Sequence, residues 1–212
     1  MGLLARAVTE LHVERLGLVP YSEAWALQTE LHGRRARREI PDTLLLLEHP
    51  HVYTIGRRGA ADDVLWDDET LRARGVEVVE TDRGGQVTYH GPGQLVGYPI
   101  IDLGPGADLV AYVRRLEDVL MATLTRFGIA GTRDPGNTGV WVGAAKIAAI
   151  GVRVTRSVTK HGFALNVSPD LSYFAGIVPC GIFDKGVTSI QAELGEAPPI
   201  DAVADVVAEV FR

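Results

Sequence analysis

The sequence predicts an α+β fold in which a mixed, largely antiparallel sheet carries helices packed on one face. Three observations lead to this prediction. Segments of strand length outnumber helical segments, several of them follow one another directly, and turn-forming glycines separate them. A chain that alternated strand and helix would instead predict a parallel sheet.

The first half of the chain is expected to begin with a helix and to continue as strands. The helix is predicted from Ser22, a candidate N-cap, to about Arg38, because apolar residues recur there at helical spacing. The continuously apolar run Thr43–Glu48 predicts a buried strand. Further strands are predicted at Val52–Gly56, as the partner of that strand, and at Gly75–Glu80, Gln86–Tyr89 and Gln94–Ile101.

The second half contains the clearest helical signal, at Asp108–Phe127. One apolar stripe runs along this segment, Asp108 can cap its start, and Gly128 can end it. Small and β-branched residues then predict three strands, and an amphipathic pattern predicts a last helix. These elements are expected at Gly139–Val142, Lys146–Val154, Thr159–Val167 and Asp201–Arg212.

Composition restricts the class of protein. The 212 residues are 46% hydrophobic and 23% charged, which predicts a single globular domain over residues 1–212. With 21 basic and 27 acidic side chains the net charge is 21 − 27 = −6, which disfavours general nucleic-acid binding. A charged N-terminus, one cysteine and no long apolar run predict a cytoplasmic protein that binds no membrane. Without coiled-coil heptads we expect a monomer.

Cys180, the only cysteine, lies between Pro179 and Gly181, which indicates a tight turn. A lone cysteine is more often a small buried apolar residue than a nucleophile. A nucleophile would need a nearby cation or helix N-terminus to stabilise its thiolate at neutral pH, and no histidine is close in sequence. Spacing alone therefore favours the structural interpretation without excluding the catalytic one.

Lys146 lies in the apolar segment GVWVGAAKIAAIGVRV, where a lysine is unusual. One interpretation is a charge on an edge strand that prevents aggregation. The other is a partly desolvated amine that exchanges protons or stabilises a thiolate. The local sequence favours neither.

The segment Arg83–His90 (RGGQVTYH), followed by GPGQL, predicts a glycine-rich turn between two strands. Glycines allow backbone N–H groups to approach a ligand closely. The segment lacks the P-loop pattern, and Gly97 stands one residue too late for a dinucleotide fingerprint. By itself it indicates either an unusual hairpin or the wall of a pocket.

The histidines and one arginine cluster allow ordinary explanations. His90 and His161 each adjoin a glycine and a predicted strand, which is typical of hydrogen-bonded core histidines. His49 and His51 have no acidic or cysteine partner at ligand spacing, so we predict a turn there and no metal site. A basic cluster in the first helix indicates either a solvated face or a docking surface for an acidic partner; it comprises Arg34, Arg35, Arg37 and Arg38.

Five segments together resemble the lipoyl (octanoyl) transferase family: EHPHVYTIGRR, DRGGQVTYHGPGQLVGYPI, GVWVGAAKIAAIGVRV, KHGFALNV and IVPCGI. The resemblance is collinear from about Leu44 to Ile190, and its longest block, Arg83–Ile100, is highly specific. It implies the α+β catalytic domain shared by biotin and lipoate protein ligases.

The resemblance also implies a reaction. An octanoyl group would move from its thioester on acyl carrier protein to one lysine of a lipoyl domain, in 2-oxoacid dehydrogenase complexes or the glycine cleavage H protein. Cys180 would carry the acyl group as a thioester, and Lys146 would act as acid and base, with no cofactor and no metal. The implied substrate-binding residues are Arg83, Gly84, Gly85, Gln86, Val87, Thr88, Tyr89, His90, Ala149, Ile150, Gly151, Gly162, Phe163 and Ala164.

Three other functions remain open at this point. An ATP-dependent lipoate ligase of the same fold would need no cysteine, although its loop has a longer glycine run than Gly84-Gly85. An amidotransferase would move octanoyl or lipoyl groups between lipoyl domains. A carrier-binding module without catalysis would leave Cys180 inert.

Overall fold

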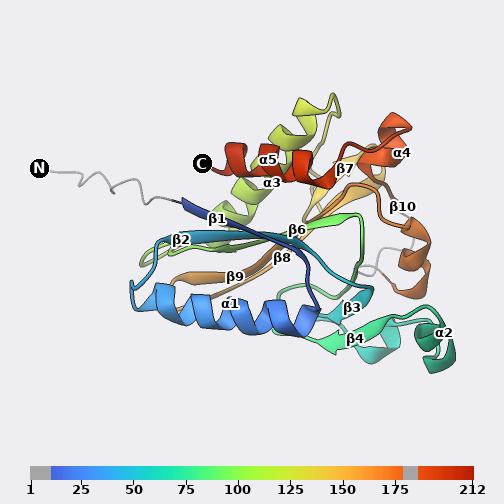
Figure 1. Ribbon diagram of the computed structural model, residues 1–212, viewed down its shortest axis with the longest axis horizontal. Coiled ribbons are helices and arrows are strands. Elements are labelled where there is room, and N and C mark those ends of the chain that lie inside the picture. Colours follow the sequence, from blue (N-terminus) through green and yellow to red (C-terminus); the bar gives the residue numbers. More distant parts are fainter. Residues whose placement is uncertain (1–10, 179–185) are drawn as a thin grey trace, which may run out of the picture.

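The computed structural model describes residues 11–178 and 186–212, and seven strands of these ranges form its main sheet (Figure 1). Antiparallel pairs join β2 to β6, β6 to β9, β9 to β8 and β8 to β7, whereas β1 and β10 lie parallel to β2 and β8. The predicted mixed, largely antiparallel sheet is therefore confirmed. The strands are β1 (Leu11–Leu18), β2 (Asp42–Glu48), β6 (Gln94–Ile100), β7 (Val140–Val142), β8 (Ala145–Thr155), β9 (Val158–Asn166) and β10 (Gly186–Val187).

Helices cover both faces of this sheet, rather than the one face that was expected. In Figure 1, α3 (Leu109–Arg126) and α5 (Ile200–Phe211) lie above the sheet, and α1 (Tyr21–Ala36) lies below it. Leu44 and Leu46 of β2 pack in the core between the sheet and helices α3 and α5. Leu45 and Leu47 pack between the sheet and α1. A strand that is apolar on both sides needs cover on both sides. The four consecutive leucines of β2 indicate in the sequence that helices cover both faces of the sheet.

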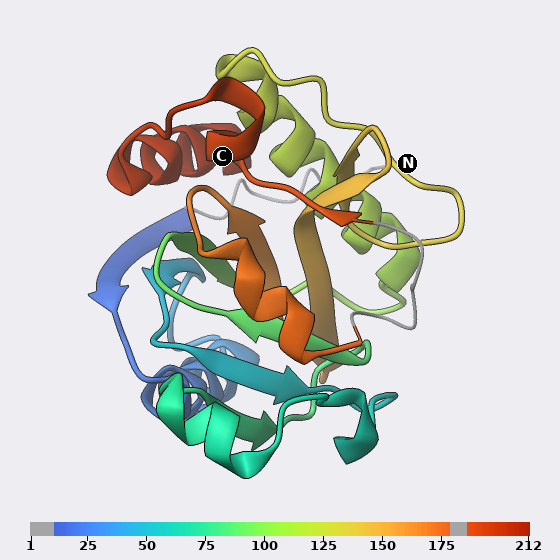
Figure 2. The same ribbon diagram turned by 90° about the vertical axis from the view of Figure 1, so that its right-hand side faces the viewer.

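A second, smaller sheet has the strand order β4-β3-β5. Together with α2 (Asp68–Ala73) it lies at the opposite end of the molecule from α3 and α5 (Figure 2). Its strands are β3 (Val52–Ile55), β4 (Glu77–Glu80) and β5 (Val87–His90). The expected pairing of β3 with β2 is wrong, because β2 is already paired with β1 and β6. The glycine-rich segment therefore begins in the loop before β5 and ends within this second sheet.

Helix ends and short elements show where sequence patterns were weak. The predicted cap Asp108 is confirmed, since its side chain accepts hydrogen bonds from the backbone of Val110 and Ala111. Ser22 is not a cap, because α1 begins at Tyr21 after Pro20. The elements without a prediction are β1, β10, α2 (Asp68–Ala73), α4 (Ile190–Leu194) and two 3₁₀ segments, η1 (Ala61–Asp63) and η2 (Leu171–Gly176).

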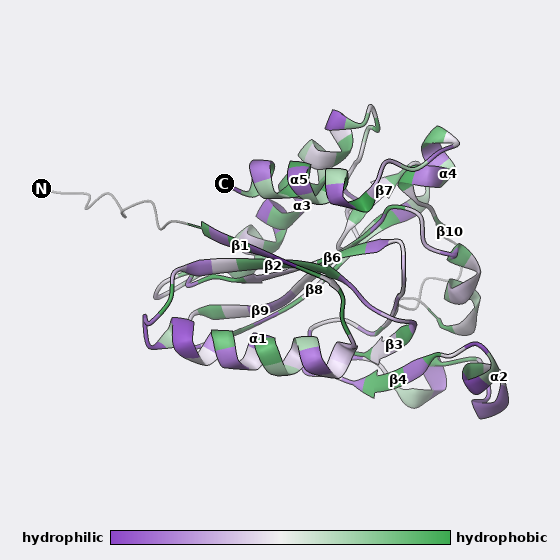
Figure 3. Cartoon of the chain, viewed as in Figure 1, coloured by the Kyte–Doolittle hydropathy of each residue, from purple (hydrophilic) through white to green (hydrophobic). Residues whose placement is uncertain are grey.

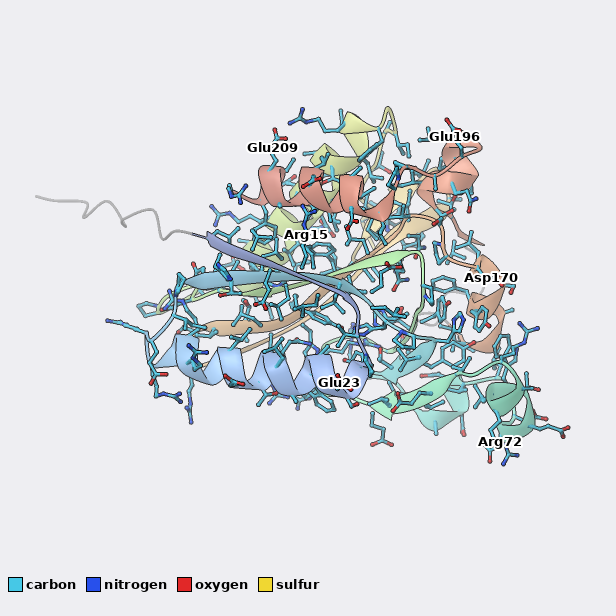
Figure 4. The ribbon with its side chains drawn as sticks, in the orientation of Figure 1. Arg15, Glu23, Arg72, Asp170, Glu196 and Glu209 are labelled. Atoms are coloured by element: carbon cyan, nitrogen blue, oxygen red, sulfur yellow. The ribbon has the colours of Figure 1, made fainter. Side chains whose placement is uncertain are left out.

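The surface is that of an ordinary amphipathic fold. Helices α1, α3 and α5 alternate between hydrophobic and hydrophilic residues (Figure 3), and charged side chains such as Arg72 and Glu209 reach outward at the periphery (Figure 4). Within the described ranges, no helix has both the length and the apolar character needed to cross a bilayer.

One arginine of the basic cluster has a structural role. The Arg35 side chain is buried, with Nε 2.7 Å from Asp42 Oδ1, and therefore links α1 to β2. Arg37 pairs with Glu39, and Arg34 lies 3.5 Å from Glu30 one helical turn away, in contacts that are largely exposed. The helical spacing could not show the Arg35 contact, because Asp42 lies beyond the end of the helix. Docking of an acidic partner by the exposed arginines stays a prediction.

Candidate active site

A cavity of about 570 Å³ is lined by the glycine-rich segment and by β8 and β9. All of the implied substrate-binding residues line it except Tyr89. Lys146 lines it as well. The wall also contains residues that were not among the predicted site residues: Tyr21, Arg58, Tyr98, Leu109, Val113, Gly136, Asn137, Thr138, Val152 and His161.

Backbone hydrogen bonds hold the glycine-rich segment in place. On one side Arg57 N donates to Arg83 O (3.0 Å) and Arg58 N donates to Gly85 O (3.1 Å). On the other side Gly84 N donates to Val152 O of β8 (3.1 Å). Gly85 has φ +93°, a conformation that favours glycine. Glycine therefore allows this segment to approach the backbone of β8, and its approach to a ligand stays a prediction.

Glycine is also required across from this segment. A Cβ at Gly151 of β8 would lie 2.8 Å from Gly84 O, and one at Gly56 would lie 2.5 Å from Gly85 O. Real Cβ atoms do not approach backbone oxygens so closely. Both glycines therefore let the segment pack directly on its supports.

Arg83 lines the cavity but directs its guanidinium toward protein groups. Nε lies 3.1 Å from Thr54 Oγ1, Nη2 donates to the Thr54 carbonyl, and Nη1 donates to Gly84 O at 3.0 Å. The buried side chain thus ties the loop to β3. These contacts indicate a residue that positions the cavity wall.

Tyr89 does not reach the cavity. It packs in the small core with Tyr53, and its hydroxyl lies 2.9 Å from His51 Nδ1. Its neighbours Thr88 and His90 do line the cavity, since successive side chains of a strand point to opposite faces. A prediction that assigns the whole segment Arg83–His90 to substrate binding cannot separate the residues that face the cavity from those that face the small core.

Lys146 lies where three strands meet. It pairs with Trp141 of β7 on one side and with Val187 of β10 on the other, so the edge-strand interpretation is wrong. Its Nζ stands 4.8 Å from the centre of the Trp141 ring, an arrangement that attracts an ammonium group. Cys180 lies outside the described residues, but β10 brings the chain that follows it alongside Lys146.

Comparison with known proteins agrees with this geometry. The family profile "Lipoyl protein ligase A/B catalytic domain" matches residues 20–212. The chain belongs to this family. It is 54% identical to an octanoyltransferase from Chloroflexus aggregans over 92% of this chain and 90% of that one. It is 52% identical to an octanoyltransferase from Koribacter versatilis over 95% of this chain and 82% of that one. These names confirm the predicted acyltransferase class.

Solved structures of lipoate and biotin protein ligases share the fold at low sequence identity. An archaeal bipartite lipoate protein ligase, studied with its E2 lipoyl domain from Thermoplasma acidophilum, is 17% identical with a TM-score of 0.74, over 96% of this chain and 82% of that one. Biotin protein ligase from Aquifex aeolicus is 12% identical with a TM-score of 0.52, over 96% and 68%. The predicted ligase-like fold is confirmed.

Glu117 is a buried carboxylate of this family member that the sequence analysis missed. It lies on α3 and accepts hydrogen bonds from Arg114 (2.7 Å), Arg133 (2.8 Å) and the backbone N–H of Gly139 (3.1 Å). The loop that it holds contributes Gly136, Asn137 and Thr138 to the cavity wall. The sequence feature that could have indicated this buried carboxylate is the position of Glu117 directly after Leu116 of the apolar stripe.

The Glu117→Gln variant should therefore be less stable. Losing charge-assisted hydrogen bonds costs about 2 kcal/mol, which lowers Tm by roughly 5 °C in a chain of this length. Asp118→Asn is the matched control, because the neighbouring Asp118 also pairs with Arg133 but is 61% exposed. Thermal unfolding of both variants checks the prediction, and equal Tm shifts would contradict it.

Asp82 organises a second polar cluster beside the cavity. Its carboxylate accepts from His161 Nε2 (2.6 Å) and Lys160 Nζ (2.9 Å) and lies 3.4 Å from Arg153 Nε. Burial alone would raise the pKa of Asp82, but the hydrogen bonds from His161 and Lys160 lower it to about 2. Burial lowers the pKa of His161 to about 4, although Asp82 opposes this shift. At neutral pH the pair is a carboxylate and a neutral imidazole.

This cluster predicts a pH dependence of stability. Because the folded pKa of Asp82 lies below the unfolded value of ~3.9, ionised Asp82 stabilises the fold above that pH, and this contribution is lost as the pH falls toward 2. Asp82→Asn should lower Tm at pH 7 and flatten its decline below pH 4. Tm measured against pH tests this, with the exposed Asp62→Asn as control. Parallel curves for wild type and Asp82→Asn would contradict it.

Proposed function

We propose that this protein transfers an octanoyl group from a carrier-protein thioester to a lysine of a lipoyl domain, through an acyl-thioester on Cys180 with Lys146 as acid and base. The observation that carries the proposal is the position of Lys146. It lines the cavity and pairs with β10, which follows the Cys180 segment, in a chain about half identical to named octanoyltransferases.

The cavity suits a saturated acyl chain along β8 and β9. Ala149 and Ala164 pair across these strands and are small, so they leave room in the cavity. Leu109, Val113 and Phe163 add apolar wall. An apolar cleft with a few polar groups is the usual form of such a site.

The proposed reaction has two steps. The Cys180 thiolate attacks the thioester carbonyl, and the departing carrier thiolate takes a proton from the Lys146 ammonium. The acceptor amine then attacks the acyl-enzyme, Lys146 takes its proton, and the Cys180 thiolate leaves. Exchange between thioesters is close to isoenergetic, and the amide that forms is the stable product. No nucleotide is required.

The proposed partners follow from this reaction. The donor is acyl carrier protein, and the acceptors are lipoyl domains of 2-oxoacid dehydrogenase complexes and the glycine cleavage H protein. That a ligase of this fold was studied with its E2 lipoyl domain supports the acceptor class. We propose that one protomer acts alone, as a single catalytic domain in the cytoplasm.

The deciding experiment mixes the protein with octanoyl-carrier protein and unmodified lipoyl domain, without ATP, and measures intact masses. The proposal predicts that the lipoyl domain gains one octanoyl group. A gain only from free octanoate with ATP would show a ligase, and a gain only from acylated H protein would show an amidotransferase. Binding of the carrier without any mass change would show a non-catalytic module.

A further inference from the structure

One end of the cavity is polar, unlike the apolar wall along β8 and β9. Four aromatic side chains form this polar end: Tyr21, His90, Tyr98 and His161, with 1%, 6%, 3% and 1% of their surface exposed. The rings of Tyr21 and His90 stack at 6.2 Å, and those of Tyr98 and His161 meet edge-on at 6.4 Å. Such a cluster is unexpected where a purely hydrocarbon chain would end.

The polar end shares the cavity with Lys146 and lies farther along β8 and β9. Tyr98 follows Gly97, which pairs with Phe163 of β9, and Phe163 pairs with Ile150 of β8. Ile150 lies ~13 Å along the strand from Lys146. An extended eight-carbon chain covers roughly 10 Å. An acyl chain that leaves the Lys146 amine on the Ile150 side therefore runs toward the polar end.

The proton of the Tyr98 hydroxyl is already used. His49 Nδ1 donates to Val19 O at 2.7 Å, so its Nε2 accepts from the Tyr98 hydroxyl at 2.7 Å. Tyr98 therefore retains no proton for a ligand.

His90 presents an acceptor. Its Nδ1 lies 2.7 Å from Gln94 Oε1, while the Gln94 amide nitrogen donates to Tyr89 O and Asn166 Oδ1. Gln94 therefore accepts from His90, and the His90 proton resides on Nδ1. Burial, more than any charge nearby, holds the pKa of His90 well below its usual value, so the ring is neutral. Its Nε2 lone pair has no hydrogen-bond partner among the described residues.

His161 presents a second acceptor. Its Nε2 donates to the Asp82 carboxylate, and its buried Nδ1 lone pair has no partner among the described residues. His161 also has φ +58°, a strained conformation for a residue with a side chain. The orphan donor nearby, Gln28 Nε2, lies on α1 and is not part of the cavity wall. The polar end thus offers two histidine acceptors to a ligand.

We propose that the polar end is a subsite for a hydrogen-bond donor on the far end of the acyl chain, so that this enzyme also transfers ω-hydroxylated eight-carbon chains. The inference rests on the proposed function. A terminal hydroxyl donates to His90 Nε2, with His161 Nδ1 as the second acceptor. A plain octanoyl chain leaves these acceptors to water, because a buried acceptor without a donor is costly.

The test compares three carrier-bound chains of matched length: octanoyl, 8-hydroxyoctanoyl and 7-oxooctanoyl, which carries only an acceptor. Pairs compete for one lipoyl domain, and product masses give the ratio of kcat/KM. We expect the hydroxylated chain within about tenfold of octanoyl and the oxo chain at least ~10-fold below the hydroxylated one. An apolar site would instead disfavour the hydroxyl by ~10²-fold. That result, or equal use of the hydroxylated and oxo chains, would overturn the proposal.

A variant assigns the preference to the subsite. His90→Phe keeps an aromatic ring but no acceptor, and we expect its hydroxyl-to-octanoyl ratio to fall about tenfold. Both products are measured in one sample, so a partial loss of folded enzyme does not change the hydroxyl-to-octanoyl ratio. An unchanged ratio in His90→Phe counts against the subsite.

A binding measurement separates this inference from the proposed function. The increase in Tm of wild type with free 8-hydroxyoctanoate, octanoate and 7-oxooctanoate ranks the same preference without any transfer. Failure of octanoyl transfer would then count against the function, and a weaker effect of 8-hydroxyoctanoate than of 7-oxooctanoate would overturn the subsite.

Discussion

The Cys180→Ser variant is expected to form no acyl-enzyme and to transfer octanoyl at least ~10³-fold more slowly than wild type, because removal of a nucleophile disables both steps at once. A serine hydroxyl remains protonated at neutral pH, whereas a cysteine thiol near a cation ionises. Intact-mass measurement after mixing with octanoyl-carrier protein checks the prediction: wild type gains one octanoyl group and the variant gains none.

The single cysteine makes this measurement unambiguous, since no other thiol in the chain can accept the acyl group. An unchanged Tm serves as the control for folding. Octanoyl transfer at the wild-type rate by Cys180→Ser would contradict a covalent mechanism. If that transfer also needed ATP and free octanoate, it would establish the ligase reaction instead.

The main sheet could be predicted because its strands carry strong local signals. The predicted strands over β2, β6, β8 and β9 agree with the structure to within one or two residues, since runs such as Thr43–Glu48 are apolar over a full strand length. The edge strand β1 was missed because LHVERLGL mixes charged and apolar residues. Local pattern cannot reveal an edge strand whose partner lies in another part of the chain.

Pairing and layer order required tertiary information. β3 follows β2 after a short turn, which made a hairpin the natural expectation, yet β3 enters the second sheet. No local preference decides which of two sheets a short apolar strand joins. The position of α1 on the opposite face from α3 likewise depends on both sides of β2 being apolar, which is a property of the packed sheet.

The candidate site was predictable where family motifs marked it. Lys146 and the glycine-rich segment were found in this way, and the structure places both on one cavity. The polar end was not found, because Tyr21 stands in a segment without a distinctive motif, and Tyr98, although it lies in the block Arg83–Ile100, reaches the cavity only through the packing of β6. His161 was assigned an ordinary core role, and its contact with Asp82 agrees with that assignment. Its orphan Nδ1 became visible only with hydrogen bonds counted atom by atom.

Replacing Lys146 should separate its two proposed roles. Lys146→Met removes both charge and base, and we expect acyl loading and transfer to fall by ~10²–10⁴-fold, as for the loss of a general acid–base group. Lys146→Arg keeps a cation but cannot release a proton at neutral pH. It should therefore retain part of the loading step, fail at transfer and accumulate the acyl-enzyme. Time-resolved intact masses of enzyme and lipoyl domain distinguish the two variants.

The matched control is Lys160→Met, which removes the charge of a lysine on the neighbouring strand β9. Lys160 pairs with Asp82 and does not line the cavity, so this variant should lose some stability and keep transfer within a few-fold of wild type. Equal losses in Lys146→Met and Lys160→Met would point to a general effect of positive charge near the cavity. Full transfer by Lys146→Arg would contradict the proton-transfer role and leave Lys146 as a fixed cation, with the proton of the acceptor amine passing to another group.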